Sequence, residues 1–235
     1  MTRFLITAVM TMLLQTNATA TADYVILLHG LGRTPLSMKR IEWTLRKQNY
    51  RVINVRYPST RVSIQDAADH WLGDVLKNQI TDSAAKVHFV AHSLGGIVLR
   101  QYLTNHEIPN LGRVVMLAPP NHGSELADHL RNNYLYRLVT GPAGQQLGTS
   151  EASVPNRLGP VDFELGVIAG DRSFNPLFSS WIPGPDDGKV SVSSAKMPGA
   201  HFLLVHHSHT WMAWSPQVNS AIAEFLRVGH FVGSY

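Results

Sequence analysis

The chain has 235 residues, of which 44% are hydrophobic and 15% are charged, and its formal net charge is +4. This composition is typical of one globular domain with a sizeable core, and it excludes an intrinsically disordered chain. The basic residues form no dense block, so a nucleic-acid-binding surface is not expected. The absence of cysteine excludes disulfides, a thiolate nucleophile and a cysteine-based zinc site.

The first twenty residues have the pattern of a secretory signal peptide. Arg3 precedes an apolar segment at residues 4–14 that is too short to span a bilayer comfortably. Ala18 and Ala20 form a small-x-small cleavage site. A buried N-terminal helix or an uncleaved anchor is the alternative. We expect cleavage near Ala20, a single mature domain over residues 21–235, and a periplasmic or secreted bacterial protein.

Strand and helix patterns alternate along the remaining chain. Continuous apolar runs, typical of strands with both faces covered, are followed by segments with helical spacing. The expected strands span residues 24–28, 51–55, 87–92, 113–118, 163–169 and 201–206, and the expected helices span 35–48, 63–80, 94–106 and 217–228. The alternation predicts a doubly wound, mostly parallel α/β sheet flanked by helices.

Two segments interrupt this alternation. Residues 121–162 contain an amphipathic piece at 125–139, followed by a stretch rich in Gly, Pro, Ser and Thr. Residues 172–188 form a long connection that carries several large apolar side chains. Long connections in a compact domain are often lids or binding loops. These apolar residues either form a small lid and the wall of a binding site, or they pack into the core.

The stretch VHFVAHSLGGIVLR at residues 87–100 places a lone serine, Ser93, between an expected strand and an expected helix. In an open α/β sheet, ligands and chemistry gather at the carboxyl ends of the strands. Ala91 and Gly95, two positions before and after Ser93, are small enough for a sharp turn. The start of the helix directs free N–H groups and a positive dipole end toward the place where an oxyanion would form. An ordinary strand-to-helix turn is the alternative.

Residues 91–95 (AHSLG) resemble the nucleophile elbow G-x-S-x-G of the α/β-hydrolase superfamily, with alanine in place of the first glycine. Residues 29–32 (HGLG) resemble the lipase loop that supplies an oxyanion donor, and residues 119–124 (PPNHGS) resemble a segment that shapes the site wall. The resemblance covers about residues 24–228. It implies an α/β-hydrolase fold with a small lid or cap, Ser93 as the nucleophile, and the backbone N–H groups of Leu31 and Leu94 as oxyanion donors.

A serine hydroxyl needs an adjacent base that a third group orients. The superfamily places its histidine after the last strand, where residues 206–209 read HHSH. We choose His209, which lies furthest into the loop and whose surroundings resemble the final-histidine loop of small bacterial lipases. His207 is the second candidate. A metal site is the alternative reading of this cluster.

The acid has two candidates. Asp187 lies in a DG-x-V segment that resembles the acid-bearing loop of bacterial lipases, and we prefer it. Asp171 ends the expected strand at 163–169, a position that many members of the superfamily use, but it also has Arg172 beside it for a local ion pair. Asp186 is expected to be a solvated loop charge.

The resemblance implies a carboxylic-ester hydrolase that works through an acyl-enzyme, without a cofactor or a metal, on small-molecule esters or lipids. Peripheral contact with lipid surfaces is compatible with this function, and the apolar segments favour uncharged esters. Two alternatives remain. One is an acyltransferase or thioesterase with the same triad, and the other is a non-catalytic periplasmic binding or assembly factor of the same fold.

Overall fold

The computed structural model describes residues 22–232, so the expected signal peptide at residues 1–20 lies outside the described residues. Six parallel strands form one sheet in the spatial order β2-β1-β3-β4-β5-β6. They are β1 (Tyr24–Leu28), β2 (Arg51–Asn54), β3 (Val87–His92), β4 (Leu111–Leu117), β5 (Leu165–Gly170) and β6 (His201–Val205). Each coincides with an expected strand, apart from small shifts at the ends.

Helices connect the strands. The longer ones are α1 (Lys39–Arg46), α3 (Gly73–Gln79), α4 (Leu94–Asn105), α6 (Tyr134–Gln145) and α10 (Pro216–Val228). The shorter ones are η1 (Pro35–Met38), α2 (Ile64–Asp66), η2 (Ala67–Leu72), α5 (Glu125–Leu130), α7 (Val154–Arg157), α8 (Pro176–Ser179), α9 (Val192–Ala195) and η3 (Met212–Trp214). The expected helix at 63–80 is present as α2, the π-helical η2 and α3 in succession. Between residues 22 and 232, no helix has the length and apolar character that crossing a bilayer requires.

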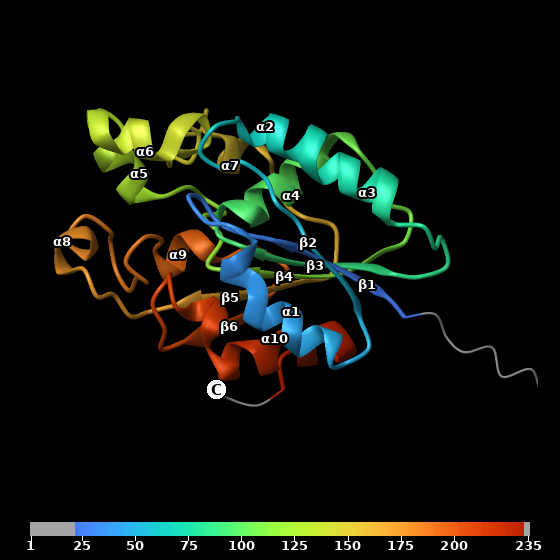
Figure 1. The fold of residues 1–235 in the computed structure, drawn as a ribbon. Coiled ribbons are helices and arrows are strands. Elements are labelled where there is room, and N and C mark those ends of the chain that lie inside the picture. The colour runs from blue at the N-terminus through green and yellow to red at the C-terminus, as the bar shows by residue number, and fades with distance from the viewer. Residues whose placement is uncertain (1–21, 233–235) are drawn as a thin grey trace, which may run out of the picture.

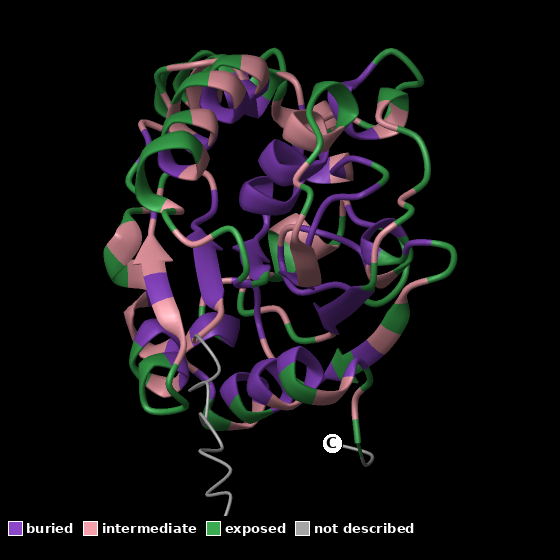
Figure 2. Cartoon of the chain, turned by 90° about the vertical axis from the view of Figure 1, so that its right-hand side faces the viewer, coloured by how far each residue is buried: buried purple, intermediate pink, exposed green. Residues whose placement is uncertain are grey.

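Both faces of the sheet are covered. Figure 1 shows α2, α3 and α4 on one face and α1 and α10 on the other. Alternate residues of β1 explain this arrangement, because Ile26 and Leu28 pack in the same cluster as residues of α4. Val25 and Leu27 pack instead with residues of α1 and α10. The central strands are therefore buried on both sides, and Figure 2 shows the exposed residues on the outer helices and loops.

The two interrupting segments gather at the end of the sheet where the strands finish (Figure 1). Residues 121–162 form α5, α6 and α7, and residues 172–188 remain a loop apart from α8. Helix α6 reaches into the Gly/Pro-rich stretch that the sequence predicts to be irregular. It has a kink at Gly141, where φ is 61°. A Cβ at Gly141 would overlap the carbonyl of Thr60, so only glycine fits this close approach.

Candidate active site

Ser93 occupies the sharp turn between β3 and α4. Its φ of 54° and ψ of −121° are unfavourable for a residue with a side chain, and strain of this kind occurs at functional sites. The Ser93 N–H donates to the carbonyl of Leu117 at 2.8 Å, and the Ser93 carbonyl accepts from the Gly96 N–H at 3.0 Å. The turn is thereby fixed to β4 and to the first turn of α4.

The small residues around Ser93 allow α4 to lie directly on the sheet. A Cβ at Gly95 would lie 2.5 Å from the carbonyl oxygen of Leu28 in β1. A Cβ at Gly96 would lie 3.1 Å from the Sδ of Met116 in β4. Packing therefore explains the glycine two residues after Ser93, because a larger side chain at Gly95 would move α4 away from β1.

The loop after β1 lies against this turn. A Cβ at Gly30 would lie 3.2 Å from both Ser93 Cβ and His92 Nδ1. The next residue, Leu31, lines the same cavity as Ser93. Leu94 is the first residue of α4, where a backbone N–H has no partner within the helix. The two residues expected to donate to an oxyanion are therefore both beside Ser93.

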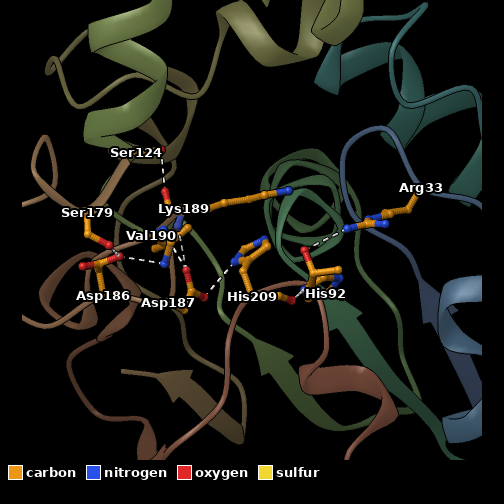
Figure 3. A network of polar contacts seen from close by, with 11 residues as sticks. Arg33, His92, Ser124, Ser179, Asp186, Asp187, Lys189, Val190 and His209 are labelled. Atoms are coloured by element: carbon orange, nitrogen blue, oxygen red, sulfur yellow. Dashed lines mark hydrogen bonds and ion pairs between the residues drawn. The ribbon is translucent and has the colours of Figure 1, made fainter. Parts of the chain in front are cut away.

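His209 and Asp187 form a buried pair, with side chains that are 6% and 1% exposed. Asp187 Oδ2 accepts from His209 Nδ1 at 2.7 Å, and Oδ1 accepts from the backbone N–H groups of Lys189 and Val190 at 3.0 and 2.9 Å. Figure 3 shows this pair and the loop that holds it. A carboxylate bound to Nδ1 fixes the imidazole so that Nε2 is the nitrogen that can accept a proton.

Ser93 and His209 line one cavity of about 400 Å³. No direct hydrogen bond joins these two described side chains in this structure. The hydrogen bond between a catalytic serine and its histidine is often long in an enzyme without substrate and shortens when the substrate binds. The placement of Ser93 and His209 in one cavity is therefore compatible with proton transfer from the serine to the histidine.

The other candidates from the sequence lie elsewhere. His207 Nε2 shares a hydrogen bond with Ser215 Oγ at 2.9 Å, and His206 Nδ1 shares one with Asp171 at 2.8 Å. Asp171 also lies 4.0 Å from Arg172, the ion pair that the sequence suggests, although His206 is its closer partner. Within residues 22–232, no group of three or more His, Asp or Glu side chains is arranged to hold a metal ion.

Asp186 is buried, so the expectation that it is a solvated charge is wrong. Its Oδ1 accepts from Ser179 Oγ at 2.9 Å and from the Gly188 N–H at 2.7 Å (Figure 3). The carboxylate therefore holds the turn that carries Asp187. No local pattern in the sequence indicates this role, because the hydroxyl partner lies at the end of α8, whose position depends on tertiary packing.

His92 is a further site residue that the sequence analysis did not single out. Its Nε2 donates to the carbonyl of His209 at 3.0 Å, and the two rings lie 4.9 Å apart. Burial, with the neighbouring His209, keeps the pKa of His92 well below its usual value. A neutral His92 thus holds the backbone of His209 in place. Its position immediately before Ser93 is the one signal for this role in the sequence.

Residues 119–124 form part of the cavity wall, as the resemblance implies. Pro120 and Ser124 both line the cavity. Ser124 Oγ accepts from the Ala127 N–H at the start of α5 and donates to the carbonyl of Lys189 at 2.9 Å. This segment therefore connects α5 to the loop that carries Asp187.

Part of the cavity wall is apolar. Its wall includes Leu126, Leu130, Val139 and Phe178, from α5, α6 and α8. Other apolar side chains of the same segments face solvent, since Phe174 is 81% exposed and Leu135 and Leu138 are 67% and 66% exposed. The two interrupting segments therefore contribute both to the wall of the cavity and to the core, since Leu147 and Val154 belong to a buried core cluster.

Solved structures with the same fold include several hydrolases. The mature lipase BlEst2 of Bacillus licheniformis has a TM-score of 0.69 and 20% identity, over 89% of this chain and 93% of its own. The phospholipase PlaB from Legionella pneumophila has a TM-score of 0.71 and 18% identity, over 88% and 60%. The metagenomic carboxyl esterase MGS0156 has a TM-score of 0.66 and 17% identity, over 90% and 75%. At these identities the similarity establishes the fold alone.

No curated protein matches the chain in sequence. Residues 25–233, by contrast, match the alpha/beta hydrolase family. The match spans most of the chain and agrees with the parallel six-stranded sheet, so the fold class predicted from the sequence is confirmed. The chain belongs to the alpha/beta hydrolase family.

Proposed function

We propose that the protein is a serine carboxylic-ester hydrolase of the lipase or esterase type. The observation that carries the proposal is that His209, bound by Asp187, lines the same cavity as Ser93, which lies in its strained turn at the start of α4. The lipase and the carboxyl esterase of similar fold support an ester as the substrate class.

In the proposed mechanism, Ser93 Oγ attacks the ester carbonyl carbon while His209 Nε2 accepts its proton. The backbone N–H groups of Leu31 and Leu94 stabilise the tetrahedral oxyanion. The carbon–oxygen bond to the alcohol then breaks, and His209 donates its proton to the leaving alkoxide. Water, deprotonated by His209, then attacks the acyl carbon. The bond to Ser93 Oγ breaks, His209 returns the proton to Ser93 Oγ, and the carboxylic acid is released. Throughout, Asp187 holds the imidazole and stabilises its protonated form.

We also propose that residues 1–20 are a cleaved signal peptide and that the domain over residues 21–235 acts in the periplasm or outside the cell, on small-molecule esters or lipids. Sequencing the N-terminus of protein recovered from the periplasm and medium of an expressing bacterium tests this proposal. The expected first residue is Thr21, and recovery of an intact Met1 terminus would contradict it.

The hydrolysis of p-nitrophenyl butyrate tests the proposed function. Ser93→Ala is expected to lower kcat by at least about 10³-fold, because the nucleophile is removed. Ser180→Ala, an exposed serine in the loop after α8, is the control and should retain the wild-type rate. Full activity of a folded Ser93→Ala variant would contradict the proposal.

The same reaction with added alcohol acceptors separates hydrolysis from acyl transfer. The proposal predicts free carboxylic acid as the main product, whereas a transferase would form the new ester. A folded wild-type protein that turns over no ester and no thioester would favour the binding-factor alternative.

A further inference from the structure

Two cationic side chains, Arg33 and Lys189, line the same cavity as Ser93 and His209. No carboxylate is among the described residues that line it. The two permanently charged side chains that line the cavity are therefore both cations, while the Asp187 carboxylate is bound to His209.

Among the described residues, the ammonium group of Lys189 is in direct contact with no carboxylate, although Asp187 lies near enough to affect its pKa. Its backbone N–H donates to Asp187 and its carbonyl accepts from Ser124, but its ammonium group forms no hydrogen bond or ion pair with any residue between 22 and 232. Figure 3 shows this side chain reaching from the Asp187 loop across the site toward the side of Arg33. Burial and the charge of Arg33 lower the pKa of Lys189, while Asp187 raises it. A partly buried ammonium without a partner is unfavourable for the free enzyme, so its position points to a ligand.

Arg33 is held at the cavity by a residue next to His209. One of its terminal nitrogens donates to Thr210 Oγ1 at 3.0 Å, and Thr210 follows His209 directly. The remaining donors of this guanidinium are available to an anion. Arg33 is close enough to Lys189 for the two charges to repel each other, and an anion between them would relieve this repulsion.

The charged and apolar parts of the cavity come from different elements. The apolar wall comes from α5, α6 and α8, whereas Lys189 lies two residues after Asp187 and Arg33 is bound beside His209. Since His209 protonates the leaving alkoxide in the proposed mechanism, the two cations lie beside the alcohol part of the substrate. The apolar wall is then left for the acyl chain.

We propose that Arg33 and Lys189 select esters whose alcohol part carries an anionic group such as a phosphate, while the acyl chain lies on the apolar wall. This inference rests on the proposed ester hydrolysis and names its substrate class. It replaces the preference for uncharged esters that the apolar segments alone favoured. Guanidinium and ammonium groups are the side chains that most often bind phosphate in proteins.

The test compares two substrates that differ by one phosphate group, 1-hexanoylglycerol and 1-hexanoylglycerol 3-phosphate. The wild type is expected to have a kcat/KM about tenfold or more higher for the phosphate ester, as charge-assisted hydrogen bonds would give. Lys189→Gln and Arg33→Gln should each lower the ratio of the two kcat/KM values about tenfold. Lys77→Gln removes an equal charge from α3, outside the cavity, and should keep the wild-type ratio.

Two results would overturn the inference. One is a wild type that prefers the uncharged ester or treats both alike. The other is a set of variants in which both kcat/KM values fall equally, as expected if Lys189 only stabilised the oxyanion. Ser93-dependent hydrolysis of the uncharged ester without any preference for phosphate would refute this inference and leave the proposed function intact. Hydrolysis of neither ester would refute both.

The salt dependence of the wild type provides a measurement that does not depend on variants folding. Raising NaCl from about 0.05 to about 0.5 M should lower kcat/KM for the phosphate ester severalfold, because salt screens the two cations. The uncharged ester should show little change. Equal salt effects on the two esters would contradict the role of Arg33 and Lys189.

Discussion

At the scale of single residues, Asp187 and Asp171 differ in every contact that decides whether a carboxylate can orient the base. Asp187 is buried and accepts from His209 and two backbone N–H groups. Asp171 lies after β5, and its partner His206 is exposed. The geometry therefore favours Asp187 as the acid and gives Asp171 a local structural role.

Replacing these two carboxylates separately tests the choice. Asp187→Asn is expected to lower kcat about 10³- to 10⁴-fold, because an amide cannot hold the same histidine tautomer or stabilise its protonated form. Asp171→Asn is the matched control and should keep kcat within about twofold of the wild-type value. Steady-state kinetics on p-nitrophenyl butyrate, with circular dichroism to verify folding, measures both. Loss of turnover in a folded Asp171→Asn variant alone would reverse the assignment.

Some of these residues follow from the sequence and others do not. Ser93, Asp187 and His209 are suggested by local motifs that occur in a known order along the chain. His92 and Lys189 carry no such motif, because their roles depend on contacts between distant segments. The hydrogen bond from His92 to His209 joins residues 117 positions apart, and only the folded chain brings them together.

At the scale of elements, the joint between β3 and α4 explains why the site has its shape. The turn at Ser93 is sharp because α4 starts at once and crosses β1 at Gly95 with no room for a side chain. The helix N-terminus is thereby held against the cavity, where its free N–H groups can act on an oxyanion.

Gly95→Ala tests this packing. The added methyl would lie 2.5 Å from the Leu28 carbonyl oxygen, so we expect a loss of about 1–3 kcal/mol in the free energy of unfolding. Gly73→Ala, at the start of α3, meets its nearest neighbour at 3.5 Å and should be neutral or stabilising by up to about 1 kcal/mol. Urea denaturation measures both. Equal stability of the two variants would show that α4 has space at Gly95.

The elements themselves were predictable where the pattern is continuous. Each strand has apolar residues at its centre, and the helix that begins after Ser63 has a capping box of Ser63 and Asp66, a pattern that marks a helix start in a sequence. The sequence did not predict the second helical piece of α6 after Gly141. The chain leaves helical geometry at Gly141, where it lies against Thr60. The short α8 was also missed, since it lies within a loop.

At the scale of the whole molecule, the buried histidines make stability depend on pH. Burial lowers the pKa values of His29, His88 and His92 below the ordinary value. Below about pH 6.5, the unfolded chain binds a proton at each of these residues while the folded chain does not. Unfolding then takes up protons, so stability is present near neutral pH and is lost as the pH falls.

The free energy of unfolding is therefore expected to decrease between about pH 7 and pH 5, by at most about 1.4 kcal/mol per pH unit for each buried histidine. His92→Gln should make this decrease less steep, because one of these protonation sites is removed. His230→Gln, at an exposed position, is the control and should leave the slope unchanged. Denaturant titrations at several pH values measure the slope, and a stability that stays constant or rises toward pH 5 would contradict the account.

The most direct test of the central claim is to locate the reactive serine chemically. The protein is treated with a fluorophosphonate, which reacts with activated serine hydroxyls, and is then digested and analysed by mass spectrometry. A single adduct on Ser93 is expected, and it should be strongly reduced in Asp187→Asn, because the base is no longer held in place. A folded wild-type protein with no adduct, or with its adduct on another serine of the cavity such as Ser124, would contradict the account.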